Sequence, residues 1–204
     1  MDKNVLLHIT CDLMTKEYLN RLLSYLQEKD ICNLFVVLGE NYDPAASEFE
    51  NTTELIKYIR QKTGQYFCIG VAAYPNCSDV KLAQTKEKIE CGADFMITQA
   101  FFDANEYAQF KLRCENFGIN IPIIPGIFAF ESQKQLHSFV NLCKIKVSNE
   151  LLRHVEDSEK LKVPCTKITK HLIQDMMTKC QVKHFHFFTL NKLENVSNIL
   201  MQIE

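Results

Sequence analysis

The feature of this sequence that most constrains its fold is a regular alternation of short apolar runs and longer amphipathic segments. The apolar runs begin near residues 5, 34, 67, 95, 121 and 185 and are rich in Val, Ile, Leu and Phe. Strands that are covered by helices on both faces have this composition, and such strands form parallel sheets. The first five runs start 29, 33, 28 and 26 residues apart, which is the spacing of β/α units. The sequence therefore predicts an α/β protein.

Helix signals fill the intervals between the runs. Thr53 is expected to cap one helix, and Thr166 opens another. The longest interval contains an insertion, residues 149–167, which we expect to form a surface excursion with its own helical turn. Because no linker or low-complexity segment interrupts the chain, we expect residues 1–204 to form a single domain of about six β/α units.

Periodicity leaves two architectures open, a doubly wound open sheet and a (β/α)8 barrel. The chain has 204 residues, whereas a (β/α)8 barrel typically has roughly 250. Neither of the glycine-rich phosphate-binding motifs, G-x-G-x-x-G or G-x-x-x-x-G-K-[ST], follows a strand. In both architectures ligands bind at the carboxyl ends of the strands, so the functional residues are expected there.

Composition excludes several classes of protein. The formal net charge of -2 argues against a partner that is a nucleic acid or an anionic membrane. No apolar stretch approaches the roughly 18 residues of a membrane span, and the N-terminus is no signal peptide. The nine cysteines are odd in number and form no C-x-x-C, which favours reduced thiols in the cytoplasm. His184 and His186 share a strand face but lack a third ligand, so we predict no metal site.

Polar and aromatic residues, with one glycine, collect where the predicted strands end. They are His8, Thr10, Gly39, Glu40, Tyr74, Gln99, Thr189 and Lys192. Gln99 is the most informative of them, because an amide within an apolar strand needs hydrogen-bond partners and a bound heterocycle would supply them.

Six motifs in sequence order resemble one known family. They are HITC (8–11), VLGE (37–40), GVAAYP (70–75), EKIECGADFMITQAFFD (87–103), IPIIPGIF (121–128) and HFFTLNK (186–192). Together they cover nearly the whole chain and resemble the methylenetetrahydrofolate reductases. The resemblance implies a (β/α)8 TIM-barrel-type catalytic domain that holds FAD. It also implies reduction of 5,10-methylenetetrahydrofolate to 5-methyltetrahydrofolate with NAD(P)H, a step of one-carbon metabolism that supplies methyl groups for methionine synthesis.

The resemblance also assigns roles to individual residues. The cofactor-binding residues would be His8, Thr10, Gly39, Glu40, Tyr74 and Lys88. Glu40 and Gln99 would be catalytic, with Glu40 near flavin N1 and beside the cationic folate intermediate. Gln99, Phe188 and Lys192 would bind the folate substrate.

The chain departs from the family pattern on the side that holds the flavin. Leu38 replaces an arginine, Glu40 replaces an aspartate, and the loop after Pro75 is shorter. Lys81, Gln84 and Glu87 stand where an acid, an amide and a basic residue are expected.

The chain also begins at what resembles the third barrel strand. We therefore expect the first two β/α units, the general-acid glutamate on strand one and the regulatory domain to be missing. Apolar edges at residues 5–11 and 185–190 would favour pairing with another chain as a homo-oligomer. The alternative to the enzyme is a truncated or degenerate non-catalytic paralogue with weak or no FAD binding.

Overall fold

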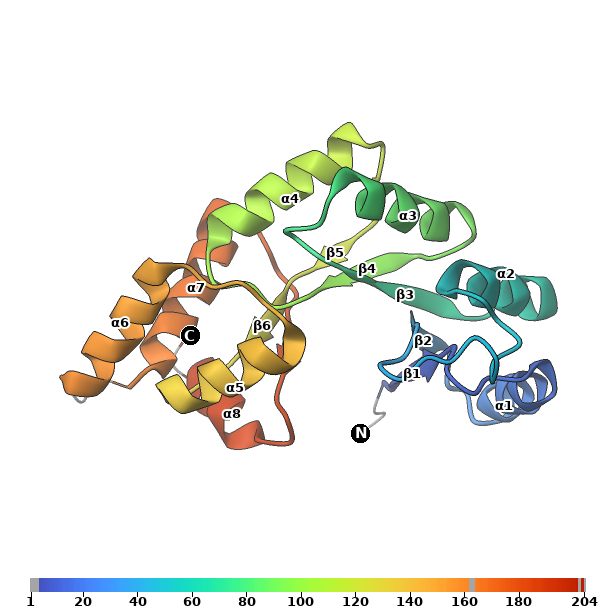
Figure 1. Cartoon of the computed structure of the whole chain (residues 1–204), viewed down its shortest axis with the longest axis horizontal. Helices are drawn as coiled ribbons and strands as arrows, with labels where there is room; N and C mark the ends of the chain where they lie inside the picture. Colours follow the sequence, from blue (N-terminus) through green and yellow to red (C-terminus); the bar gives the residue numbers. More distant parts are fainter. Residues whose placement is uncertain (1–3, 162–163, 202, 204) are drawn as a thin grey trace. The chain divides into compact units, whose positions relative to one another are not determined.

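The computed structural model describes residues 4–161, 164–201 and 203, which contain eight helices and seven strands (Figure 1). The elements in chain order are β1 (Leu6–Thr10), α1 (Lys16–Glu28), β2 (Asn33–Val37), α2 (Thr52–Thr63), β3 (Cys68–Ala73), α3 (Asp79–Glu90), β4 (Phe95–Thr98), α4 (Ala104–Asn116), β5 (Ile123–Ile124), β6 (Gly126–Phe128), α5 (Gln133–Cys143), α6 (Asn149–Lys160), α7 (Thr166–Lys179), β7 (His186–Phe188) and α8 (Leu193–Leu200). Strands and helices alternate from β1 to β5, as the sequence predicts, whereas β6 follows β5 directly and α5, α6 and α7 follow one another.

The chain divides into two compact units, which are described separately. Unit 1 comprises Met1–Ile97 and Cys114–Ile123, and unit 2 comprises Thr98–Arg113 and Ile124–Glu204. The single domain over residues 1–204 stays a prediction.

In unit 1 the strands β1, β2 and β3 pair side by side and parallel, and the five-stranded sheet has the order β1-β2-β3-β4-β5. Leu34, Ile69 and Val71 on one face of these strands are fully buried. Helices α2 and α3 pack on β2 and β3 respectively and bury their own apolar residues. This arrangement confirms the predicted parallel α/β fold.

The other face of the same strands carries a row of aromatic residues. The register places His8 opposite Phe35, and Phe35 opposite Gly70. A Cβ at Gly70 would collide with the rings of Phe95 and Phe35, so only glycine leaves room for both rings over β3. The His8 ring lies 4.8 Å from the Phe35 ring and ends the row.

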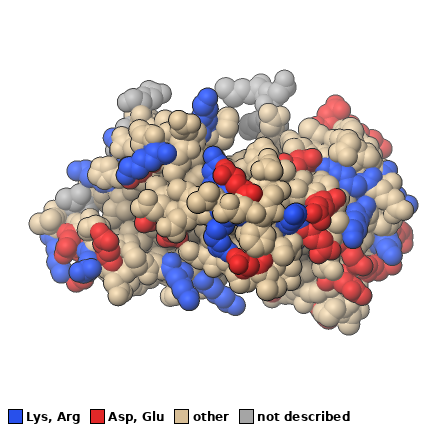
Figure 2. Space-filling model, turned by 90° about the horizontal axis from the view of Figure 1, so that it is seen from above, with Lys and Arg blue, Asp and Glu red and all other residues tan. Residues whose placement is uncertain are grey.

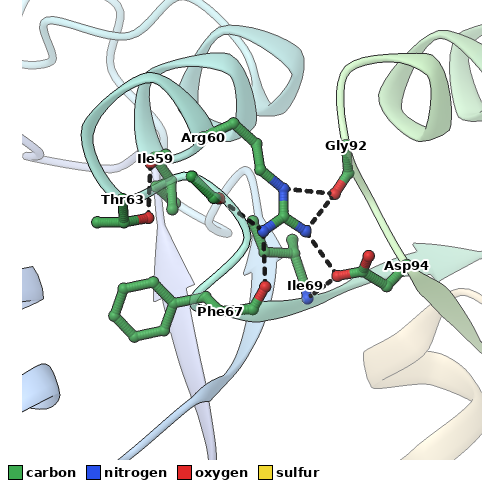
Figure 3. A network of polar contacts seen from close by, with 8 residues as sticks. Ile59, Arg60, Thr63, Phe67, Ile69, Gly92 and Asp94 are labelled. Atoms are coloured by element: carbon green, nitrogen blue, oxygen red, sulfur yellow. Dashed lines mark hydrogen bonds and ion pairs between the residues drawn. The ribbon is translucent and has the colours of Figure 1, made fainter.

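One arginine ties the end of α2 to the starts of β3 and β4 (Figure 3). The Arg60 guanidinium donates to Phe67 O at 2.6 Å, to Gly92 O at 2.6 Å and to Asp94 Oδ2 at 2.6 Å. Asp94 Oδ2 also accepts from Ile69 N at 2.7 Å. The group lies at the amino ends of β3 and β4, opposite to the carboxyl ends where functional residues are expected, and all its contacts are within the protein.

In unit 2 strands β6 and β7 pair parallel beside an aromatic core. The rings of Phe128 and Phe139 stack with centroids 3.7 Å apart. Phe188 packs against this core and lies over Gly126, where an added Cβ would come within 2.6 Å of its Cε2 atom. The close approach of β6 to β7 therefore depends on a glycine.

Three sequence predictions are wrong in detail. The run 121–128 forms two strands rather than one, because Pro125 has no N–H that could join a sheet ladder. The first of them, β5, joins the sheet of β4, and the second, β6, pairs with β7. The N-cap of α2 is Asn51, whose side chain accepts from Glu54 N, and not Thr53. The insertion forms a full helix, α6, rather than one helical turn.

Candidate functional site

A cavity of about 660 Å³ opens at the carboxyl ends of β2 and β3 and is called here the unit 1 cavity. Its walls come from four segments of unit 1: residues 36–40, residues 50–53 at the start of α2, the end of β3 with Tyr74, and one face of α3. Four of the six predicted flavin contacts line it, namely Gly39, Glu40, Tyr74 and Lys88. The structure thus brings together residues that lie up to 49 positions apart (39 to 88).

The turn at Gly39 packs directly on the end of β1. Gly39 has a φ of 103°, and a Cβ there would lie 2.7 Å from the Cβ of Asp12 and 3.5 Å from that of Thr10. Both the backbone conformation and the space therefore require glycine. Asp12, which follows the end of β1, packs against this turn but does not line the unit 1 cavity.

His8 and Thr10 lie on β1 but are not among the residues that line the unit 1 cavity. His8 is largely exposed on the sheet face. The neighbouring protein still covers part of its ring, and this burial lowers the pKa of the imidazole. Thr10 contributes to the packing beneath Gly39. Their roles as flavin contacts stay predictions.

The α3 wall of the cavity carries Lys81, Gln84 and Lys88 on one face of the helix. The Lys81 ammonium lies 5.7 Å from the centroid of the Tyr74 ring, a cation–π contact. Lys88 is half-buried, and its pKa is lowered first by burial and then by the charge of Lys81. Glu87 partly opposes this shift.

The start of α2 brings backbone N–H groups to the cavity, but side chains already bind some of them. Asn51 Oδ1 accepts from Glu54 N at 3.0 Å, and Glu54 Oε2 accepts from Glu50 N at 2.8 Å. This reciprocal cap occupies donors that an anion would otherwise use at a helix N-terminus. The positive charge available to a ligand in this cavity therefore comes from Lys81 and Lys88.

A second cavity, of about 350 Å³, lies in unit 2 at the carboxyl ends of β6 and β7. Lys192, the predicted substrate-binding cation, lines it together with Leu190 and Ser132, the N-cap of α5. The role of Lys192 in binding substrate stays a prediction. Leu190 and Asn191 both have positive φ, 46° and 62°, which is uncommon for a leucine and marks a tightly constrained loop.

The other two predicted folate contacts do not line this cavity. Phe188 is half-buried against the aromatic core of unit 2, with its ring 5.8 Å from that of Phe139. Gln99 is also half-buried and lies just after β4, which ends at Thr98, so the prediction that it sits within a strand is wrong. Its Oε1 accepts from Ala100 N at 2.9 Å.

In the part of the chain that the structure describes, no three His, Cys, Asp or Glu side chains are grouped so that they could hold a metal ion. None of the described helices has the length and apolar composition that crossing a bilayer requires. On the face drawn in Figure 2, acidic and basic side chains are interspersed.

The fold and the position of these cavities define a class, the α/β proteins whose parallel strands open at their carboxyl ends onto cavities. The family model described as methylenetetrahydrofolate reductase matches residues 2–204, and the chain belongs to this family.

Two curated relatives match nearly the whole chain. Methylenetetrahydrofolate reductase 2 of Schizosaccharomyces pombe is 33% identical over 222 residues, which cover 95% of this chain and 35% of the relative. A probable methylenetetrahydrofolate reductase (NADH) of Oryza sativa is 28% identical, covering 97% of this chain and 37% of the relative. The chain thus spans about a third of the length of these relatives.

A solved structure shows the same fold. It is a protein from Clostridium thermocellum that binds two copies of 5-methyl-5,6,7,8-tetrahydrofolic acid. It matches with a TM-score of 0.68 and 17% identity, covering 96% of this chain and 70% of that one. This likeness confirms the predicted fold class.

Proposed function

We propose that the chain binds FAD in the unit 1 cavity and carries the reaction of its family, the reduction of 5,10-methylenetetrahydrofolate to 5-methyltetrahydrofolate with NADH or NADPH. One observation carries the proposal: Gly39, Glu40, Tyr74 and Lys88, which the family resemblance assigns to the flavin, line one cavity at the carboxyl ends of β2 and β3. Four separate segments of unit 1 contribute to it.

The residues of this cavity fit a flavin dinucleotide in chemistry and in size. Lys88 offers a cation for phosphate, the Tyr74 ring offers a flat apolar surface, and the Glu40 carboxylate can accept hydrogen bonds from hydroxyl or ring N–H groups. A volume of about 660 Å³ lies within the range of cofactor sites. FAD, when bound, supplies hydride transfer between a nicotinamide and the folate.

The protein's own part is to orient the reactants and to stabilise charge. A fixed anion such as the Glu40 carboxylate lowers the energy of a positive charge that develops beside it, which is the role that the family resemblance gives this residue. In unit 2, Lys192 would bind a carboxylate of the folate. The contact between Ala100 N and Gln99 Oε1 orients the Gln99 amide so that its NH₂ group can donate to a pterin.

The test is a titration of the purified chain with FAD. We expect bound flavin, with absorption maxima at roughly 375 and 450 nm. The absorbance near 450 nm should bleach on anaerobic addition of NADH or NADPH and return on addition of 5,10-methylenetetrahydrofolate. A colourless protein that takes up no added FAD would refute the proposal.

A second candidate function is a non-catalytic relative that binds folate without a tightly held flavin. Two observations favour it: Leu38 lines the unit 1 cavity where the family has an arginine, and Glu87 adds a negative charge to the α3 wall. This candidate predicts measurable folate binding with no flavin uptake, so the same titration distinguishes the two functions.

A further inference from the structure

The insertion that forms α6 borders a third cavity, which the proposed function does not use. This cavity has a volume of about 760 Å³ and lies in unit 2 between α6, α7 and the start of α4. It shares no lining residue with the unit 1 cavity or with the cavity at Lys192. It is called here the α6–α7 groove.

The two long walls of the groove are each one face of a helix. On α6 and just after it, the lining residues are spaced by four, three and four positions, which places them along one side of the helix. They are Glu150, His154, Asp157 and Leu161. On α7 the lining residues follow the same rule, and they are Lys167, Ile168, His171, Leu172 and Asp175. Two helices that each present one face to a shared groove provide the geometry in which a third helix packs.

Apolar side chains form the floor of the groove, and a further one is exposed at its rim. Leu151 and Leu172 are buried, and Phe102 is half-buried. Leu161, by contrast, is 74% exposed although it lines the same groove. A leucine that is exposed next to such a floor adds to the apolar surface that a partner can remove from water.

Carboxylates dominate the rim of the α6–α7 groove. Among the described residues that line it, the only cation is Lys167, the histidines are counted as neutral at pH 7, and carboxylates outnumber the cation by three. The four acidic residues are Asp103, Glu150, Asp157 and Asp175. A surface with this excess of one sign attracts a partner of the opposite sign.

The chain's own lysines satisfy only part of this negative charge. Asp157 Oδ1 lies 3.9 Å from Lys160 Nζ, and Asp175 Oδ2 lies 2.8 Å from Lys179 Nζ. Exposed ion pairs within one helix contribute little, and each carboxylate keeps lone pairs for a second donor. In the described part of the chain Glu150 has no ion-pair partner. The rim can therefore accept further cations.

The spacing of the carboxylates on α6 indicates the conformation of the partner. Glu150 and Asp157 are seven residues apart on one face, which is about 10 Å along the helix axis. A helix that lies along α6 presents one side at the same interval, so cations seven residues apart would meet both carboxylates. In an extended peptide the same distance corresponds to about three residues, and an odd spacing places the two cations on opposite sides.

We infer that the α6–α7 groove docks a basic amphipathic helix of a partner protein. Lysines or arginines at intervals of seven residues would meet the carboxylates of the rim, and the apolar face of the helix would pack on Leu161 and the floor. The groove and the unit 1 cavity have no residue in common, so this inference does not rest on the proposed function.

The experiment measures the binding of a fluorescein-labelled peptide to the full chain by fluorescence anisotropy at about 0.1 M salt. The peptide has about 18 residues of Ala, Leu and Lys, with leucines along one helical face and lysines beside them at intervals of seven. One control peptide has the same composition in scrambled order, and another has Glu in place of Lys. Spermidine, whose binding is measured by calorimetry, represents a small polycation.

The variants remove the charge and the apolar contact separately. The first combines Glu150→Gln with Asp157→Asn, and the second is Leu161→Ala. Glu156→Gln is the matched control, because Glu156 also lies on α6 but does not line the groove. All four side chains are exposed, so the variants should keep the circular dichroism spectrum of the wild type.

We expect the double variant to weaken binding of the basic peptide by about five- to thirtyfold, the combined value of two exposed ion pairs. Leu161→Ala should weaken it by a similar factor, because less apolar surface leaves water on binding. Glu156→Gln should bind as the wild type does. The scrambled and the acidic peptides should bind at least about tenfold more weakly than the designed one.

Three outcomes would overturn the inference. The first is a wild-type chain that does not bind the designed peptide at about 0.1 mM. The second is a scrambled peptide that binds as well as the designed one, since the groove would then not read a helix face. The third is spermidine binding that depends on Glu150 and Asp157 in a chain that does not bind the peptide, which would make the groove a site for a small polycation.

Discussion

Replacing Arg60 by methionine should destabilise unit 1 more than the loss of any surface ion pair. Methionine keeps much of the length of the side chain but removes all of its hydrogen-bond donors. The guanidinium donates to three carbonyls, Gly64 O, Phe67 O and Gly92 O, and to the Asp94 carboxylate. The substitution therefore leaves several acceptors without their partner in one step.

The size of the effect follows from burial. The Arg60 side chain is 11% exposed, and that of Asp94 is 40% exposed. Breaking a fully buried ion pair costs about 3–5 kcal/mol, but the exposed part of Asp94 is solvated and reduces this figure. Each buried acceptor left unpaired adds about 1 kcal/mol or more. We therefore expect a loss of about 2–4 kcal/mol in the free energy of unfolding.

Urea denaturation followed by circular dichroism measures this quantity, and the matched control is Arg21→Met. Arg21 lies 3.7 Å from Glu17 with both side chains largely exposed, so its removal should change the stability by about 0.5 kcal/mol or less. In thermal denaturation the loss at Arg60 corresponds to a fall in Tm of about 6–12 °C for a chain of this size. If Arg60→Met is no less stable than Arg21→Met, the network in Figure 3 is not a stabilising element and the reasoning fails.

Three further predictions concern single residues. A methyl group at Gly126 would overlap Thr98 O and crowd Phe188, so Gly126→Ala should lose about 1–3 kcal/mol of stability; an unchanged Tm would contradict the close packing of β6 and β7. Gln99→Ala should lower folate affinity by about tenfold at an unchanged Tm, and a well-folded variant with wild-type affinity would remove Gln99 from the site. Burial raises the pKa of the Cys11 thiol to about 11, so this thiol stays neutral at about pH 8 and gains reactivity only as the pH rises toward that value. Iodoacetamide should therefore label the exposed Cys32 before the buried Cys11 in mass spectra, and equal rates would show that Cys11 is accessible.

Much of the fold could be predicted from the sequence because each buried strand is a short apolar run. The break at Pro125 was visible in the sequence, but a run such as IPIIPGIF reads as continuous by hydrophobicity alone. Which polar residue caps α2 could not be decided, because Asn51, Thr52 and Thr53 all favour that position. The cap depends on where the helical dihedral angles begin.

The candidate site was predictable where its residues follow strand ends. Gly39, Glu40 and Tyr74 do so, and they line one cavity. Glu50 and Asn51 reach the same cavity from the irregular segment before α2, and periodicity carries no information about the path of such a segment. Phe188 ends a strand but does not line the cavity of Lys192. An aromatic residue at a strand end can pack in the core as readily as it can contact a ligand, and Phe188 packs on Phe139.

The contact between Lys81 and Tyr74 has an optical consequence. The chain contains seven tyrosines and no tryptophan, so its near-ultraviolet absorption and emission come mainly from phenol rings. Tyr74 lies in the unit 1 cavity with an ammonium group 5.7 Å from its ring centroid. A ligand that draws this ammonium away changes the electric field at the ring and hence the tyrosine spectrum. The tyrosine spectrum of the wild-type chain should therefore change when an anion enters the cavity, without any added label. The Tyr74→Phe variant should not show this change.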